Sequence, residues 1–290
     1  MKILFTILIS AIALFAQEAF ITPQELTKQL HNPKTIILDT TDKETYSKGH
    51  IPNAQQVEIS AFRHWVNNEY LLMNSPKQIE DIAQRLGIDQ DSYVILYGHN
   101  KPKELLKASY IALALIVNGF ENISILDGGY KAWKENFGNV ENMISTKTPR
   151  FVKGNFTANY NPDVLVNMDY VKENIGKVAM IEARPKKFYD GTAASQGVKR
   201  LGHISGAQSS NWQKKFTESE KLLADKELKH IFYDEHKLNQ EKTVVTYCTG
   251  GLEASMNWYI LTQYLKFKDV KLYDASMKEW GNRTYTPMEK

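Results

Sequence analysis

The sequence predicts an α/β fold of two similar tandem domains, each a mainly parallel sheet with helices on both faces. Short apolar runs rich in β-branched residues alternate with stretches of helical periodicity, such as residues 79–86 and 105–117. The same order of landmarks occurs twice along the 290 residues. A chain of this length has room for about two domains of ordinary size.

The repeat rests on four kinds of matched stretch: a buried strand ending in an acid, a Gly-His-Ile turn, a strand ending in tyrosine, and a segment ending in tryptophan. The anchor residues of the four pairs are Asp39 and Glu182, His50 and His203, Tyr97 and Tyr247, and Trp133 and Trp280. The last three pairs are separated by 153, 150 and 147 residues. Landmarks in the same order, with small drifts in spacing, indicate a duplicated domain.

The first sixteen residues have the pattern of a secretory signal peptide. Lys2 supplies a positive charge, residues 3–15 are apolar, and Ala16 is a small residue suited to cleavage. The apolar run is shorter than the roughly 20 residues that span a bilayer. We therefore expect a mature protein that is periplasmic or otherwise exported and that has no stable membrane association. An uncleaved anchor is the alternative.

The remaining chain divides at a segment with few apolar residues. Residues 141–163 contain Pro149, Gly154 and Pro162, which is typical of a connection between domains. The expected boundaries are residues 17–145 for the N-terminal domain, 146–160 for the linker and 161–290 for the C-terminal domain.

The composition excludes several functional classes. The chain is 42% hydrophobic and 24% charged, as globular proteins are. Its 36 basic and 33 acidic residues are spread along the chain, so the net charge of +3 gives no reason to expect a nucleic-acid partner. The seven histidines lack the spacing of metal ligands, and one cysteine cannot form a thiolate cage, so no metal site is expected.

The only cysteine, Cys248, follows a β-branched run and precedes a helical pattern that includes Ala254 and Trp258. It cannot form an internal disulfide, so an exported protein would carry it as a free thiol. A buried, inert cysteine is the ordinary alternative. Its place at a strand tip favours a nucleophile instead. Gly250 and Gly251 would let amides of residues 249–253 point at the sulfur and lower its pKa.

Together, the two Gly-His-Ile turns, the Cys248 loop and the stretch that ends at Trp133 resemble the tandem-domain rhodanese-type sulfurtransferases, which include thiosulfate and 3-mercaptopyruvate sulfurtransferases. The resemblance covers nearly the whole mature chain. It implies two rhodanese-like domains, the C-terminal one carrying sulfur as a persulfide on Cys248. The implied partners are a small donor, thiosulfate or 3-mercaptopyruvate, and a thiol or cyanide acceptor. No metal or organic cofactor is implied.

The resemblance also implies that Arg184 faces the substrate and could hold a sulfonate or carboxylate. A salt bridge between Arg184 and Glu182 is the alternative. Arg200 is a further candidate for the same anion, with solvated surface charge as its alternative. The full set of expected substrate-binding residues is Arg184, Thr249, Gly250, Gly251, Leu252, Glu253 and Arg200.

The N-terminal unit is expected to be catalytically silent, because Gly98 occupies the place that Cys248 has in the second unit. His50 and His203 are shared by the active and the silent copy. We therefore assign both histidines to turn and core packing rather than to catalysis, and we assign Trp133 and Trp280 likewise.

Glu253 departs from the family, in which this loop often carries basic residues. A negative charge near a persulfide is unfavourable unless it is turned away or paired, for example with Arg184. The neutral loop segment before Glu253 resembles mercaptopyruvate-type loops more closely, so the donor stays open between thiosulfate and 3-mercaptopyruvate.

Two other functions are alternatives to sulfur transfer. A phosphatase of the same fold would need an arginine six residues after Cys248, where Ala254 stands. A periplasmic persulfide carrier or binding protein without turnover remains an alternative.

Overall fold

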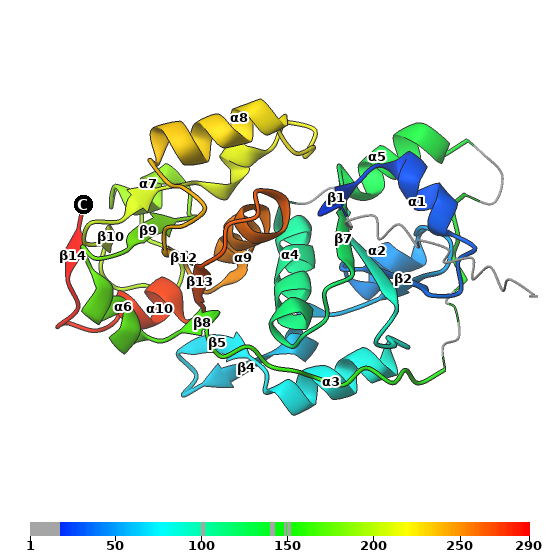
Figure 1. The fold of residues 1–290 in the computed structure, drawn as a ribbon, viewed down its shortest axis with the longest axis horizontal. Coiled ribbons are helices and arrows are strands. Elements are labelled where there is room, and N and C mark those ends of the chain that lie inside the picture. The colour runs from blue at the N-terminus through cyan, green and yellow to red at the C-terminus, as the bar shows by residue number, and fades with distance from the viewer. Residues whose placement is uncertain (1–17, 100–101, 140–142, 148, 150–151) are drawn as a thin grey trace, which may run out of the picture.

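The computed structural model describes residues 18–99, 102–139, 143–147, 149 and 152–290. The expected signal peptide lies outside these residues, as do residues 148, 150 and 151 of the expected linker. Two sheets lie towards opposite ends of the long axis. Helices α4 (Pro102–Val117) and α9 (Leu252–Tyr259) stand side by side between them (Figure 1).

The N-terminal sheet has five parallel strands in the order β1-β7-β6-β2-β3. Its strands are β1 (Phe20–Ile21), β2 (Thr35–Asp39), β3 (Ala54–Gln56), β6 (Tyr93–Tyr97) and β7 (Ile123–Leu126). The C-terminal sheet is also parallel, with the matching order β8-β13-β12-β9-β11. Its strands are β8 (Leu165–Val166), β9 (Ala179–Glu182), β11 (Gln208–Ser209), β12 (Val244–Tyr247) and β13 (Val270–Tyr273). The identical strand order confirms the predicted α/β class and duplication.

The helices follow the same correspondence. Those of the N-terminal unit are α1 (Pro23–Gln29), α2 (Lys43–Ser47), α3 (Pro76–Arg85), α4 and α5 (Gly129–Phe137), with a 3-10 turn at Ile59–Phe62. Those of the C-terminal unit are α6 (Met168–Asn174), α7 (Lys186–Tyr189), α8 (Asp225–Lys229), α9 and α10 (Ser276–Trp280), with a 3-10 turn at Trp212–Lys215. α8 and α9 continue as π-helical segments over His230–Glu235 and Ile260–Tyr264. In the described part of the chain, no helix combines the length and apolar character needed to cross a bilayer.

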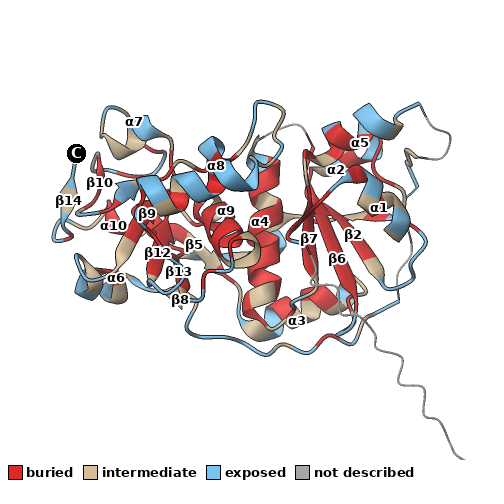
Figure 2. Ribbon diagram, turned by 45° about the horizontal axis from the view of Figure 1, so that its top comes forward, coloured by how far each residue is buried: buried red, intermediate tan, exposed pale blue. Residues whose placement is uncertain are grey.

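The inner strands β6, β7 and β12 are buried on both faces, as a parallel sheet covered by helices requires. All five residues of β6 are buried (Figure 2). Val94 and Leu96 join a core that continues into the C-terminal unit, whereas Ile95 and Tyr97 join a core on the outer face. The continuous core includes residues of α4 and α9 and of both sheets. The two units are therefore packed into one body.

A hairpin of the N-terminal unit reaches the C-terminal unit. It pairs β4 (Arg63–Val66) antiparallel with β5 (Tyr70–Met73) through a turn at Asn67 and Asn68, whose φ values are 50° and 56°. Positive φ at both central residues is the signature of a type I′ hairpin turn. A second antiparallel pair joins β10 (His203–Ile204) to β14 (Met288–Glu289).

The repeated histidines make the same packing contacts in both units. The ring of His50 stacks on Tyr46 with centroids 3.8 Å apart, and that of His203 stacks on Tyr189 at 3.7 Å. Nδ1 of each histidine lies 2.9 Å from the backbone oxygen of the same tyrosine. These contacts fit the assignment of both histidines to turn packing.

Equivalent tyrosines mark the two loop positions. The hydroxyl of Tyr97 accepts from the Ile51 amide at 3.1 Å, and that of Tyr247 accepts from the Ile204 amide at 3.0 Å. Gly98 therefore stands where Cys248 stands in the second unit. A Cβ added to Gly98 would lie 2.7 Å from the carbonyl carbon and 2.8 Å from the Cβ of Glu104 at the start of α4. In the N-terminal unit, Glu104 thus occupies the space that a side chain at position 98 would need.

We predict that a Gly98→Cys, Cys248→Ser double variant does not turn over thiosulfate, because the new side chain overlaps α4. The overlap is expected to lower the free energy of unfolding by about 1–3 kcal/mol relative to Cys248→Ser alone. Urea unfolding and sulfur-transfer assays of both variants test this. Thiosulfate turnover by the double variant would contradict the silence of the N-terminal unit.

Candidate active site

The backbone at Cys248 is held by the start of α10. Cys248 follows β12, which lies between β9 and β13 in the sheet. Its amide donates to Oγ of Ser276 at 3.0 Å, and its carbonyl accepts from the Met277 amide at 3.1 Å. The carbonyl of Thr249 accepts from the Lys278 amide at 2.9 Å. These hydrogen bonds hold Cys248 and Thr249 against the first residues of α10.

Only one of the two loop glycines is required by the geometry. Gly251 has φ of 89°, and a Cβ there would overlap Oδ1 of the buried Asp274. Gly250 does not have a positive φ, and a Cβ there would meet Cδ of Lys278 at an ordinary 3.5 Å. The expectation that both glycines curl the loop is therefore correct for Gly251 alone.

The Cys248 side chain is completely buried, and its surroundings disfavour the thiolate. Burial, followed by the negative charge of Glu253, raises the pKa of the thiol to about 12. Hydrogen bonds from the amides of Gly250 and Ala254 lower the pKa but do not offset the other two effects. The expected amide cradle is thus present only in part, and the thiol is protonated at neutral pH in this conformation.

Glu253 is directed towards the cysteine rather than paired with Arg184. Its Oε2 accepts from the Thr249 amide at 3.4 Å, so this amide serves the carboxylate instead of the sulfur. The side chain of Leu252, also expected in the substrate-binding set, packs against the continuous core. The loop itself contributes no cation.

Arg184 is 1% exposed, and its hydrogen bonds are made within the protein. Its guanidinium pairs through Nε and Nη2 with the carboxylate of Glu182, the alternative weighed from the sequence. Nη2 also donates to the carbonyl of Gly202 at 2.8 Å, and Nη1 donates to Oγ of Ser195 at 3.0 Å. Ser195 Oγ in turn lies 3.5 Å from Oγ1 of Thr249. Arg184 is therefore linked to the Cys248 loop through Ser195, and its expected contact with substrate stays a prediction.

Arg200 is directed away from the loop. Its guanidinium donates to the carbonyls of Thr286 and Trp280 at 2.9 and 3.1 Å, and to the hydroxyl of Thr286. These bonds tie it to the C-terminal segment. Its Nη1 and Nη2 atoms serve Trp280 and Thr286, and its expected contact with the substrate anion stays a prediction.

The sequence did not reveal that the N-terminal hairpin completes the loop. Arg63 Nη2 donates to the Gly250 carbonyl at 2.6 Å and lies 3.6 Å from Oδ1 of Asp274. The guanidinium also lies 4.6 Å from the ring centroid of Tyr110, whose hydroxyl donates to Oδ2 of Asp274 at 2.7 Å. Burial raises the pKa of Asp274, and Arg63 and Tyr110 oppose this. The Asn67–Asn68 turn could have indicated the hairpin, but nothing local indicates what it contacts.

Lys278 supplies a cation beside the loop that the loop itself lacks. Its side chain passes close to Gly250, and its ammonium lies 5.5 Å from the ring centroid of Trp65 in the hairpin. Trp65 is 56% exposed, which is unusual for this side chain. The lysine was not among the expected site residues because it lies in the repeated segment that ends at Trp280.

Among the described residues, no group of three or more histidine, cysteine, aspartate or glutamate side chains could hold a metal ion. The groups at this place include a thiol, two hydrogen-bonding amides and the charges of Glu253, Arg63, Arg184 and Lys278.

Comparison with known proteins defines the class. The rhodanese-like domain family matches residues 22–136 and 167–283, and the chain belongs to this family with two such domains. It is 28% identical to the sulfur carrier protein TtuD of Thermus thermophilus over 94% of this chain and 97% of the relative. It is 27% identical to the 3-mercaptopyruvate sulfurtransferase of Escherichia coli K12, over 93% of this chain and 97% of the relative. The crystal structure of SseA from Escherichia coli shares the fold, with a TM-score of 0.75 and 24% identity. The match covers 90% of this chain and 99% of SseA.

We predict that Arg63→Ala loosens the Cys248 loop and lowers the free energy of unfolding by about 3 kcal/mol, because it leaves the Asp274 carboxylate buried without its cation. Urea unfolding and steady-state sulfur transfer measure the two effects. Arg85→Ala, at an exposed arginine of α3, is the matched control and should change stability by no more than about 0.5 kcal/mol.

Adding Asp274→Asn to Arg63→Ala should recover part of the lost stability, since the unpaired charge is then gone. Equal unfolding midpoints for Arg63→Ala and the wild type would show that the Arg63–Asp274 contact does not stabilise the site.

We also predict that removing the charge of Glu253 lowers the pKa of Cys248. The midpoint pH for alkylation by iodoacetamide should fall by about one unit or more in Glu253→Gln, and further in Glu253→Arg. A lower pKa increases the thiolate fraction at neutral pH, so alkylation of Cys248 at neutral pH becomes faster. Glu253→Arg should also raise kcat/KM for thiosulfate. Glu241→Gln, at an exposed carboxylate, is the control. An unchanged midpoint in both Glu253 variants would refute the electrostatic argument.

Proposed function

We propose that the protein is a sulfurtransferase that moves a sulfane sulfur from thiosulfate or 3-mercaptopyruvate to a thiol or cyanide through a persulfide on Cys248. The observation that carries the proposal is the position of the only cysteine. It stands at the tip of β12, beneath the amides of Gly250 and Ala254, in one of two rhodanese-like domains. Relatives over most of the chain include a 3-mercaptopyruvate sulfurtransferase and putative thiosulfate sulfurtransferases.

In the first half-reaction the Cys248 thiolate attacks the outer sulfur of the donor. A new S–S bond forms, and the S–S bond of thiosulfate or the C–S bond of mercaptopyruvate breaks. The bonding electron pair leaves with sulfite, or with the enolate of pyruvate, which then takes up a proton. Donated hydrogen bonds from Gly250 and Ala254 would stabilise the negative charge on the attacking sulfur and on the persulfide.

In the second half-reaction the acceptor attacks the outer sulfur of the persulfide. A thiolate or cyanide forms the new bond to that sulfur, the S–S bond to Cys248 breaks, and the electron pair returns to the enzyme as thiolate. The atoms and charges balance without an external oxidant or reductant.

Both half-reactions require the site to open. The cysteine is completely buried in this conformation, so a donor reaches Sγ only when neighbouring side chains move. Opening also lets solvent or an anionic donor replace part of the apolar surroundings, which reduces the burial that raises the pKa of the thiol. Trp65 and Lys278, in contact at the edge of the loop, are the side chains we expect to move.

Glu253 bears on the choice of donor. Thiosulfate is a dianion, whereas 3-mercaptopyruvate carries one carboxylate charge, so Glu253 repels thiosulfate more strongly. We propose that 3-mercaptopyruvate is the better donor for the wild type, and that Glu253→Arg narrows the difference.

A second candidate function is a persulfide carrier without turnover, which the similarity to the sulfur carrier protein TtuD favours. A carrier would be labelled once by a sulfur donor and would release that sulfur only to a partner protein. In either case we propose, from the leading segment, that the protein works outside the cytoplasm.

We predict that the purified protein transfers sulfur catalytically to cyanide or dithiothreitol, and that Cys248→Ser abolishes transfer from both donors. Steady-state assays with thiosulfate and with 3-mercaptopyruvate, alongside mass spectrometry of the persulfide, measure this. Lys266→Gln, an exposed change at the end of the same helical segment, is the control. Retained turnover in Cys248→Ser would overturn the mechanism, whereas a single labelled turnover in the wild type would favour the carrier.

A further inference from the structure

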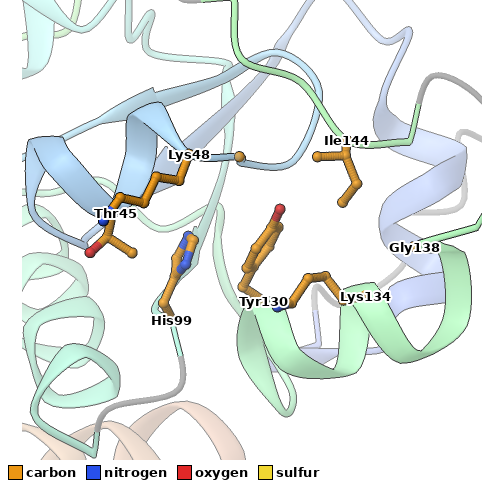
Figure 3. A pocket seen from close by; sticks show the side chains of 8 residues that line it. Thr45, Lys48, His99, Tyr130, Lys134, Gly138 and Ile144 are labelled. Carbon is orange, nitrogen blue, oxygen red and sulfur yellow. The ribbon is translucent and has the colours of Figure 1, made fainter.

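A cavity of about 440 Å³ opens in the N-terminal unit (Figure 3). Its volume lies within the range of ordinary small-molecule sites. Two glycines and six side chains line it: Thr45, Lys48, His99, Tyr130, Lys134 and Ile144.

The cavity stands at the carboxyl edge of the N-terminal sheet. Thr45 belongs to α2, which follows β2, His99 follows β6, and Tyr130 begins α5, which follows β7. Open parallel α/β sheets bind their ligands outside this edge. His99 directly follows Gly98, so the cavity adjoins the position that corresponds to Cys248. The N-terminal unit therefore has glycine instead of cysteine at this position and a cavity beside it.

The charges around the cavity favour an anion. Lys48 and Lys134 are part of the lining, and the described lining residues include no carboxylate. The buried carboxylate of Asp39 lies behind His99, and its charge opposes that of the two lysines in part. Lys48 is paired with the exposed Glu44 at 2.6 Å, which reduces its contribution. Lys134 is exposed and forms no ion pair with a described residue, and its ammonium lies 5.3 Å from the ring centroid of Tyr130. Lys134 is therefore the principal cation available to a ligand.

Tyr130 is a largely buried side chain whose hydroxyl can donate a hydrogen bond to a ligand in the cavity. Tyr130 is 5% exposed, and its hydroxyl makes no hydrogen bond to another described residue. Burial and the charge of Asp39 raise the pKa of Tyr130 to about 12, so the hydroxyl remains a donor. Figure 3 shows the hydroxyl directed into the space between Lys48 and Ile144.

His99 stacks on Tyr130 and is held in place by a hydrogen bond to Asp39. Its ring stacks on Tyr130 with centroids 4.1 Å apart, and its Nε2 lies 2.9 Å from Oδ2 of the fully buried Asp39. The hydrogen bond to Asp39 fixes the ring, so the tyrosine ring is held in place on one face. The two side chains form a rigid wall of the cavity.

We propose that this cavity binds a small organic anion, whose carboxylate or sulfonate group is held by the Lys134 ammonium and the Tyr130 hydroxyl and whose apolar body lies against Ile144. The anionic group matches the cation and the donor. The apolar body matches the aliphatic side chain opposite them. The site is separate from Cys248 and is independent of the proposed sulfur transfer.

Isothermal titration of the purified protein with benzoate tests the proposal, with benzamide as a neutral analogue of the same shape and sulfate as an inorganic anion. We expect benzoate to bind at least about ten-fold more tightly than either. Lys134→Gln should weaken benzoate binding about ten-fold, and Tyr130→Phe should weaken it several-fold. Lys131→Gln, at an exposed lysine of the same helix, should leave it unchanged.

Cys248→Ser separates this site from the catalytic one and should bind benzoate as the wild type does. Four results would overturn the proposal: no benzoate binding at millimolar concentration, benzamide or sulfate binding as tightly as benzoate, binding insensitive to Lys134→Gln and Tyr130→Phe, or binding lost in Cys248→Ser. The last result would assign the anion to the catalytic site instead.

Discussion

The packing of α4 against α9 is the constraint on which the rest of the molecule depends. These helices carry the continuous core that joins the two sheets, and Oγ of Ser109 lies 2.8 Å from Oγ of Ser255 where they cross. α9 begins directly after the Cys248 loop, so the contact also fixes that loop relative to the N-terminal unit. Arg63 of the β4–β5 hairpin can then contact both Gly250 and Asp274. The N-terminal domain thereby supports the loop that carries Cys248.

The balance of charges at Cys248 is decided by burial. The amides of Gly250 and Ala254 favour the thiolate, but burial and Glu253 together raise the pKa of the thiol to about 12. Arg184 does not relieve this, because its guanidinium is bound by Glu182. The site is therefore closed and protonated in this conformation, and a donor that opens it would change the charge balance at the same time.

Much of the fold and part of the site could be predicted because their signals are local. Alternation of apolar strands with helical periodicity predicts a parallel α/β fold, and matched landmarks predict its duplication. The repeated histidines were assigned to packing because they occur in both copies, and their stacking on Tyr46 and Tyr189 agrees with that assignment. The roles of Arg184, Arg200 and Arg63 could not be assigned in this way. An arginine at a strand end looks the same in sequence whether it faces a substrate or a buried carboxylate.

The class of fold, its duplication and the position of the single thiol at the end of a strand can all be read from the sequence. These features follow from periodicity, spacing and residue type, which are properties of neighbouring residues. Only the tertiary structure decided which charges surround that thiol and that Arg63, 187 residues before Gly250, holds the loop. Only it placed a cavity beside the corresponding position of the silent unit. The physical reason is that burial and charge pairing depend on distances across the folded chain, which no local pattern records.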